Sequence, residues 1–243
     1  MNRVRNNPVR LTVSVILPTF NERENVAEVI TGIRTAFSDA EIIVVDDNSP
    51  DGTGQIVARI AERDARVRLV QRNERGLTSA IQRGVNESHG EVIFWIDCDS
   101  TMSPAMMLVL LNEIERGADV ATGSRFVPGG KDARDDRMPV VFSAVINLAA
   151  RVLLGGSVRD YTTGFVAARR SVLDQITLRG DYGEYCVDFL ARAIRKNFRV
   201  VEVGWVYKQR VLGESKTAPS FIGFIRRGWP YVTTILRLAL HRC

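Results

Sequence analysis

Residues 92–99 read Val92-Ile93-Phe94-Trp95-Ile96-Asp97-Cys98-Asp99, an apolar run followed by two acids that flank one residue. A short, uninterrupted apolar run is typical of a strand buried on both faces of a parallel sheet. Open α/β sheets bind their ligands at the carboxyl ends of such strands. Because two adjacent carboxylates repel each other, we expect Asp97 and Asp99 to hold a divalent metal with a phosphate-bearing ligand. The alternative is a solvated turn or a helix cap.

The rest of the chain alternates between expected strands and expected helices. Further strands are predicted at 13–17, 41–45, 67–70, 118–122 and 200–203, and helices near 26–37, 56–61, 80–85, 104–116, 140–154 and 184–196. This alternation predicts an α/β fold with a mostly parallel sheet flanked by helices. Pro18 is expected to end the first strand, and Thr19 or Asn21 to cap the first helix. The segment 128–139 is predicted to be a loop, and no linker marks a second domain.

Length and charge restrict the class of protein. The chain has 243 residues and a net charge of +5, enough for one large α/β domain. The positive charge indicates a polyanionic partner: nucleotide phosphates, nucleic acid or an anionic membrane surface. The three cysteines, Cys98, Cys186 and Cys243, are scattered, which is typical of a reducing compartment and argues against structural zinc. The two histidines argue against a multi-histidine metal site.

No secretory or membrane-spanning segment is expected. The basic residues Arg3, Arg5 and Arg10 lead into a short strand rather than a long apolar core. No uninterrupted apolar run reaches transmembrane length. The closest is 221–243, which is interrupted by Arg226, Arg227, Gly228 and Pro230.

A second acidic pair, Asp46-Asp47, follows the predicted strand 41–45. The carboxyl ends of parallel strands meet at one edge, so this pair and the Asp97–Asp99 pair should converge. Helix capping and turn formation are the alternative for Asp46 and Asp47. We interpret Asp51, in Asp51-Gly52-Thr53, as a turn residue.

Three motifs in this order resemble the inverting family 2 glycosyltransferases with the GT-A fold. They are Pro18-Thr19-Phe20-Asn21-Glu22, Val45-Asp46-Asp47-Asn48-Ser49-Pro50-Asp51-Gly52-Thr53 and Asp97-Cys98-Asp99. Four more resemble the polyprenyl (dolichyl) phosphate mannosyltransferase branch of that family. They are Arg75-Gly76-Leu77, Gly123-Ser124-Arg125-Phe126, Thr162-Thr163-Gly164-Phe165 and Gly213-Glu214-Ser215-Lys216. The ordered set is specific, although no single motif is.

The resemblance implies a single GT-A domain over residues 12–217. It implies that a hexose, mannose from GDP-mannose, is transferred to a polyprenyl phosphate at the cytoplasmic face of a membrane, with Mg²⁺ or Mn²⁺. Three alternatives stay open: UDP-glucose or another sugar nucleotide as donor, a saccharide hydroxyl as acceptor, and a non-catalytic lipid-binding homologue. Nucleic acid is not expected as a partner.

The resemblance also implies which residues bind the donor. They are Pro18, Thr19, Phe20, Glu22, Val45, Asp47, Asp97, Cys98, Asp99, Arg210 and Lys216. Asp97, Asp99 and Thr101 would hold the metal, although Thr101 stands where the branch usually has Gln, and Cys98 where it usually has Ala. The resemblance implies a catalytic set of five residues: Asp97, Asp99, Arg125, Arg210 and Lys216. The three cations would stabilise the negative charge that develops on a leaving diphosphate.

The acceptor determines what further groups are needed. A phosphate monoester, with a second pKa of about 6, is already anionic and needs positioning cations more than a base. The candidates are Arg125, Arg137 and Ser143, with Arg134 as the alternative to Arg137 and Asn147 nearby. For a hydroxyl acceptor, the candidate bases are Asp188 and Glu184, whose alternative is an exposed position on a helix.

Two segments are expected to lie at a membrane surface. Residues 140–154 are apolar over more than one stripe, and residues 218–243 contain no acid but mix arginines with aromatic and aliphatic side chains. This composition is typical of an interfacial helix. Peripheral binding or a membrane-anchoring subunit would then hold the protein at the membrane, and residues 1–11 would form a basic tail. Ordinary core packing is the alternative for both segments.

Overall fold

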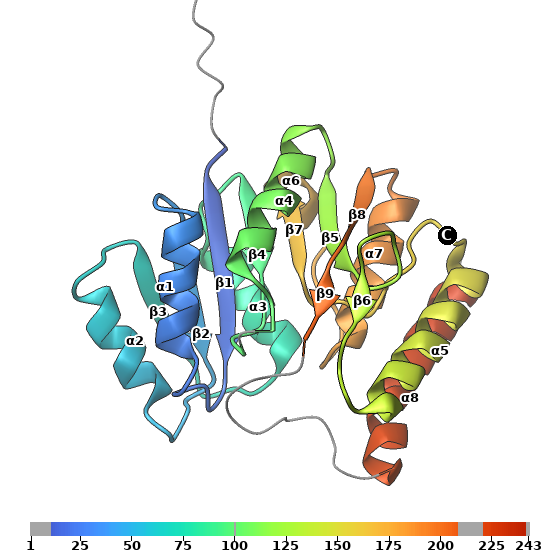
Figure 1. The fold of residues 1–243 in the computed structure, drawn as a ribbon, viewed down its shortest axis with the longest axis horizontal. Helices are drawn as coiled ribbons and strands as arrows, with labels where there is room; N and C mark the ends of the chain where they lie inside the picture. The colour runs from blue at the N-terminus through green and yellow to red at the C-terminus, as the bar shows by residue number, and fades with distance from the viewer. Residues whose placement is uncertain (1–10, 100, 209–220, 242–243) are drawn as a thin grey trace, which may run out of the picture.

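The computed structural model describes residues 11–99, 101–208 and 221–241, and its centre is a seven-stranded sheet of order β3-β2-β1-β4-β7-β5-β8 (Figure 1). The strands are β1 Val13–Thr19, β2 Glu41–Asp46, β3 Val67–Gln71, β4 Val92–Trp95, β5 Val120–Ser124, β7 Val166–Arg169 and β8 Val200–Gly204. Every pairing in this sheet is parallel except those of β7, which runs antiparallel to β4 and β5. The prediction of a single, mostly parallel α/β domain is confirmed.

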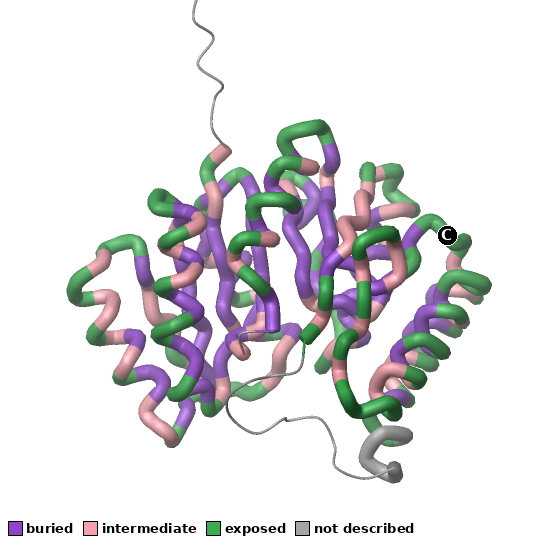
Figure 2. The backbone as a smooth tube through the Cα atoms, viewed as in Figure 1, coloured by how far each residue is buried: buried purple, intermediate pink, exposed green. Residues whose placement is uncertain are grey.

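Helices cover both faces of the sheet (Figure 1). They are α1 Val26–Ala36, α2 Thr53–Ala61, α3 Leu77–Glu87, α4 Pro104–Glu115, α5 Arg137–Leu154, α6 Arg170–Leu173, α7 Glu184–Arg195 and α8 Phe221–Leu240. Successive strand residues point to opposite faces, so Val15 and Leu17 pack with α1 and α4, whereas Ile16 packs with α3 and α7. The central strands are therefore buried on both faces, as the purple trace of Figure 2 shows, whereas the edge strands β3 and β8 are largely half-buried.

Three boundaries differ from the sequence prediction. Strand β1 continues through Pro18 to Thr19, because its partner β4 ends opposite Ile16 and no ladder bond on that side needs a Pro18 N–H. Neither Thr19 nor Asn21 caps α1, whose N-cap is Asn25. Helix α5 begins at Arg137 rather than 140, because the Asp136 side chain accepts a hydrogen bond from the Met138 N–H (3.0 Å).

The sequence prediction lacked three strands. Strand β7 consists largely of small residues, and its insertion between β4 and β5 depends on long-range pairing that periodicity does not reveal. The segment expected to be a loop contains β6 Lys131–Asp132, which pairs with β9 Val206–Tyr207. This ribbon brings Asp132 beside Tyr207, and both lie near the candidate site described below.

Helices α5 and α8 lie side by side at one end of the sheet (Figure 1). One face of α8 joins the core through Ile235 and Leu238, so core packing holds for that face. Helix α8 also approaches α5 closely: a Cβ on Gly228 would lie 2.3 Å from Cζ of Phe142. A larger residue at this crossing would therefore require the Phe142 ring to move.

The outer face of α5 is apolar and open to solvent. Val141, Val145, Leu148 and Val152 are between 58% and 72% exposed. Of the helices in the described ranges, α5 is the one long and apolar enough to span a membrane by length and composition, with 22% of its residues buried. The sequence prediction had placed the nearest such segment at 221–243. A helix packed on a soluble protein can pass the same test.

Candidate active site

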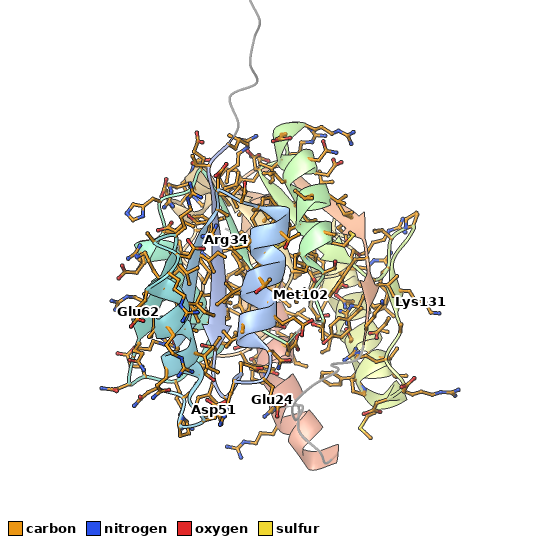
Figure 3. The ribbon with its side chains drawn as sticks, turned by 60° about the vertical axis from the view of Figure 1, so that its left-hand side comes forward. Glu24, Arg34, Asp51, Glu62, Met102 and Lys131 are labelled. Atoms are coloured by element: carbon orange, nitrogen blue, oxygen red, sulfur yellow. The ribbon has the colours of Figure 1, made fainter. Side chains whose placement is uncertain are left out.

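The candidate site lies at the carboxyl edge of β1, β2 and β4, where both acidic pairs emerge. These strands are parallel neighbours, so Asp47 after β2 and Asp97 after β4 lie at the same edge, as predicted. Figure 3 labels Asp51 at this edge, the lower one in that view. The two acids of the first pair have different environments.

Asp46 has a structural role. It is fully buried, and its carboxylate accepts hydrogen bonds from the Thr19 hydroxyl (2.9 Å), the Ser49 hydroxyl (2.5 Å) and the Ser49 N–H (2.9 Å). The Ser49 hydroxyl in turn accepts from the Asn21 N–H (2.9 Å). These bonds join the loops that follow β1 and β2 and satisfy the buried charge. They also explain why Thr19 does not cap α1.

Asp51 is a turn residue, as predicted. Its carboxylate accepts from the N–H (2.9 Å) and hydroxyl (2.6 Å) of Thr53 and from the Arg23 N–H (3.0 Å). Burial alone would raise the pKa of Asp51, but these hydrogen bonds outweigh it and lower the pKa below its usual value.

Asp47 is held by a residue that sequence reasoning missed. Its carboxylate forms a bidentate ion pair with Arg72 and accepts from the Gly76 N–H (3.0 Å). Next to this pair, the Arg75 guanidinium lies 4.2 Å from the ring centre of Phe20. The Arg75-Gly76-Leu77 motif is the signal that could have indicated this contact with the loop after β2.

Of the other expected donor residues, Glu22 and Val45 are buried, and two lie outside the described part of the chain. Glu22 is buried and accepts from the Asn25 side chain (3.0 Å). Val45 is fully buried in the core. Arg210 and Lys216 lie outside the described residues, as does the whole segment 213–216.

The oxygens of Asp99 and Thr101 lie together. Asp99 accepts from the Thr101 hydroxyl (2.6 Å) and N–H (3.1 Å), while Cys98 points into the core. Within the ranges that the structure describes, no three His, Cys, Asp or Glu side chains cluster in a way that could hold a metal. Two carboxylates and a hydroxyl fit a hard cation such as Mg²⁺ or Mn²⁺, whose remaining ligands would come from a phosphate-bearing substrate.

The pKa of Tyr207 is affected by burial and by the charge of these two acids. Burial, followed by the negative charges of Asp97 and Asp99, raises the pKa of Tyr207 to about 12. Its hydroxyl is therefore protonated at neutral pH. The β6–β9 ribbon thus places a neutral aromatic wall next to the acidic pair.

A cavity of about 190 Å³ opens beside Asp97. Its wall combines three arginines, hydroxyl groups and aromatic rings. The principal members are Asp97, Arg125, Arg134, Ser143, Thr162, Tyr182, Trp205, Tyr207, Arg227 and Tyr231. A wall of this kind fits a ligand with an anionic end and an apolar body.

Arg125 is fixed by a buried ion pair. Its guanidinium donates to both carboxylate oxygens of Asp160 (2.8 and 2.7 Å) and lies 3.3 Å from Asp132. Burial opposes the charged form, but these carboxylates outweigh it and raise the pKa of Arg125. Sequence reasoning missed Asp160, although it lies two residues before the Thr162-Thr163-Gly164-Phe165 motif.

A hydroxyl network extends from Arg125. Its guanidinium donates to the Thr162 hydroxyl (2.6 Å), which also accepts from the Asn147 side chain (2.9 Å) and pairs with the Ser143 hydroxyl (2.9 Å). The predicted pair Arg125 and Ser143 is thus brought together in one wall. Arg134, paired with Asp132 (2.6 Å), also lies in this wall. Arg137 is exposed at the first position of α5, outside the wall.

The two candidate bases are engaged elsewhere and are buried, not exposed. Asp188 pairs with Arg192 (2.7 Å) and with Arg237 of α8 (2.9 Å). Glu184 accepts from the N–H groups of Asp181 (2.8 Å) and Tyr182 (3.2 Å) at the start of α7. Both acids stabilise α7 and its neighbours.

Comparison with known sequences adds a family and relatives. The sequence model of the family described as "Glycosyl transferase family 2" matches residues 14–177. A polyprenol monophosphomannose synthase of Mycolicibacterium smegmatis is 38% identical, over 86% of this chain and 82% of its own. An undecaprenyl-phosphate mannosyltransferase of Micrococcus luteus is 34% identical, over 88% of this chain and 90% of its own. A dolichol-phosphate mannosyltransferase of Pyrococcus furiosus is 34% identical over 85% of this chain, which spans 59% of that protein.

Solved structures share the fold. A glucosyl-3-phosphoglycerate synthase from Mycobacterium tuberculosis, in complex with Mn²⁺, UDP and glucosyl-3-phosphoglycerate, superposes with a TM-score of 0.71 at 20% identity. The match covers 94% of this chain and 80% of that one. The same protein in complex with Mg²⁺ and UDP also gives a TM-score of 0.71, at 19% identity, over 94% of this chain and 79% of the other. At this identity the likeness extends to the fold alone.

Removing the charge of Asp160 tests the buried ion pair. Asp160→Asn should lower the free energy of unfolding by about 3–5 kcal/mol, because it leaves the Arg125 guanidinium buried without its main counter-charge. Urea denaturation measures the change. The matched control is Asp174→Asn, an exposed site that should stay within about 0.5 kcal/mol of the parent. Equal unfolding midpoints for the two variants would contradict the assignment.

Proposed function

Because the chain belongs to glycosyl transferase family 2, we propose that it transfers mannose from GDP-mannose to a polyprenyl phosphate. The relatives named above, two of which it matches over most of their length, support this substrate class. The observation that carries the choice of acceptor is the cavity wall. Among its described residues Asp97 is the one acid, while Arg125, Arg134 and Arg227 carry guanidinium groups that can donate hydrogen bonds to a phosphate. Arg125 and Arg134 are also paired with Asp160 and Asp132, which do not line the cavity.

A phosphate acceptor fits this wall better than a hydroxyl acceptor. A sugar hydroxyl needs a base to remove its proton, and both candidate bases, Asp188 and Glu184, are engaged in other contacts. A phosphate monoester is already anionic near neutral pH and needs orientation only. Arg125, Arg134 and Ser143 would orient it through charge-assisted hydrogen bonds. UDP-glucose or another sugar nucleotide is the second candidate for the donor.

The proposed reaction is one in-line displacement. An oxygen of the acceptor phosphate attacks the anomeric carbon of the sugar, and the bond from that carbon to the donor's diphosphate breaks. The configuration inverts, the products are a polyprenyl phosphate sugar and a nucleoside diphosphate, and no proton has to be removed from the acceptor. Arg210 and Lys216, with Arg125, are proposed to stabilise the negative charge on the leaving group.

Asp97, Asp99 and Thr101 are proposed to hold Mg²⁺ or Mn²⁺ together with the donor's diphosphate. When bound, the metal would neutralise charge on the leaving diphosphate. The solved neighbours in complex with Mn²⁺ or Mg²⁺ and UDP support a metal of this class. Asp47, Glu22 and Phe20 are proposed to border the nucleoside, with Pro18, Thr19, Val45 and Cys98 shaping the same edge.

The apolar outer face of α5, with the exposed Trp229 on α8, is proposed to lie on the cytoplasmic surface of a membrane. Lipid-linked acceptors are presented at such a surface, and the cavity opens between these helices and the sheet. The catalytic domain would then comprise residues 12–217 and the interfacial segment 218–243. That boundary lies outside the described residues. An anchoring subunit remains a candidate partner.

A donor panel tests the function directly. With polyprenyl phosphate and Mg²⁺ or Mn²⁺, radiolabelled GDP-mannose should give a labelled lipid, and UDP-glucose at least tenfold less, as is usual where a site hydrogen-bonds one base. The measurement is the radioactivity extracted into the lipid fraction. Labelled lipid from none of the sugar nucleotides would refute the proposal, and labelling from UDP-glucose alone would replace the donor.

The metal assignment is tested by Asp99→Ala. Turnover should fall by a factor of at least 10², because the loss of one of two carboxylates weakens metal binding at the diphosphate. The rate is measured against Mg²⁺ and Mn²⁺ concentration. Glu62→Ala, an exposed acid at the end of α2, is the control and should match the parent. An unchanged metal dependence in Asp99→Ala would remove Asp99 from the metal site.

The membrane face is tested by the double substitution Val145→Glu/Val152→Glu. Two charges on the outer face of α5 should weaken binding to anionic vesicles by about tenfold or more, since apolar burial contributes about 0.8 kcal/mol per CH₂. Vesicle co-sedimentation measures the effect. Leu108→Glu/Val109→Glu places the same charges on exposed apolar positions of α4 and should leave binding unchanged. Equal loss in both variants would point to charge alone.

A further inference from the structure

We propose that Arg227 of α8 is a phosphate-binding residue of the acceptor site. The C-terminal helix would then complete the site in addition to contacting the membrane. This inference rests on the proposed function of the cavity and adds a residue that no sequence motif indicates. It is carried by the charges of the cavity wall, the orientation of the Arg227 guanidinium and the packing of α8.

The charges of the wall leave a role for a third cation. Arg125 lies between Asp160 and Asp132, and Arg134 pairs with Asp132. The two guanidinium groups are therefore balanced by two buried or half-buried carboxylates, and together they offer no excess positive charge. A phosphate monoester carries about −1.5 to −2 near pH 7. Arg227 brings a third guanidinium group to the same wall, which also contains Asp97.

The guanidinium of Arg227 is oriented by stacking. It lies 5.3 Å from the ring centre of Tyr182, another residue of the wall. A cation–π contact uses the flat face of the guanidinium, whereas phosphate is bound by the N–H groups along its edge. The two contacts are compatible, so Tyr182 would hold Arg227 in place while its edge binds the phosphate.

Close packing fixes the turn of α8 that carries Arg227. The next residue, Gly228, abuts the Phe142 ring of α5. One turn further, the Tyr231 hydroxyl lies against Gly183 at the start of α7, where a Cβ would come within 1.9 Å of it. Small residues at both contacts let α8 approach closely from two sides. The backbone of the turn that carries Arg227 is therefore packed against α5 and α7, while the Arg227 side chain itself is exposed at the cavity.

The chain contains a matched control for this proposal. Arg226 is adjacent on α8, carries the same charge and is exposed, but it lies outside the cavity wall. Arg226→Gln and Arg227→Gln remove equal charge from the same helix. A comparison of the two separates a contact with the acceptor from a general electrostatic effect. Arg227→Lys keeps the charge but removes the planar fork.

The assay uses a water-soluble, short-chain prenyl monophosphate as acceptor, so that membrane binding does not enter. Arg227→Gln should raise the acceptor KM on the order of 10- to 100-fold, the range for losing charge-assisted hydrogen bonds, while the donor KM stays unchanged. Arg227→Lys should fall between Arg227→Gln and the parent, and Arg226→Gln should match the parent. An acceptor KM for Arg227→Gln equal to that of Arg226→Gln would overturn the proposal.

A binding measurement separates this proposal from the proposed function. Isothermal calorimetry should show that the full chain binds the short-chain prenyl monophosphate more tightly than the corresponding alcohol, and that Arg227→Gln loses this preference. A parent protein that binds the monophosphate but transfers no sugar would refute the proposed function and leave Arg227 supported. Equal affinity for phosphate and alcohol, or no loss in Arg227→Gln, would refute the role of Arg227. Thermal unfolding of each variant shows that it is folded.

Discussion

The buried ion pair between Arg125 and Asp160 is the contact on which the proposed acceptor half of the site depends. It joins the end of β5 to the loop before β7, and through Thr162 it reaches Asn147 and Ser143 on α5. A buried pair of this kind contributes little net stability compared with an apolar replacement, but removal of one partner is costly. Its value is geometric: three segments far apart in the sequence are held in one cavity wall.

The proposed donor half is organised by a different constraint, the parallel sheet. Parallel neighbours place the ends of β1, β2 and β4 at one edge, so the acids there need neutralising contacts. Asp46 obtains them from hydroxyls and an N–H, and Asp47 from Arg72. Asp97 and Asp99 are the acids proposed to bind a metal together with the donor's diphosphate. The contacts of Asp46 and Asp47, by contrast, account for their charges within the protein.

The sequence predicted the first half of the fold well because its strands are continuous apolar runs followed by turn residues. It missed β7, whose Ala167 and Ala168 have low strand propensity, and the β6–β9 ribbon, of which β6 lies within the expected loop. Asp97, Arg125 and Ser143 could be found from motifs. Asp160 and Arg72 were missed, although each lies beside a motif, because their partners are distant in the sequence. No motif indicates Arg227, whose role is proposed from the cavity wall. The choice between Arg134 and Arg137 likewise depends on where α5 begins.

Helix α8 sets a limit on how this protein can be shortened. Ile235 and Leu238 belong to the core, and Arg237 pairs with the buried Asp188. A truncation made to obtain a more soluble catalytic fragment would expose core residues and remove one of the two cations paired with that carboxylate. Solubility is better improved by polar substitutions on the outer face of α5, where Val141 and Leu148 make few contacts that folding requires. In expression work, the C-terminal helix should be treated as part of the enzyme rather than as a removable anchor.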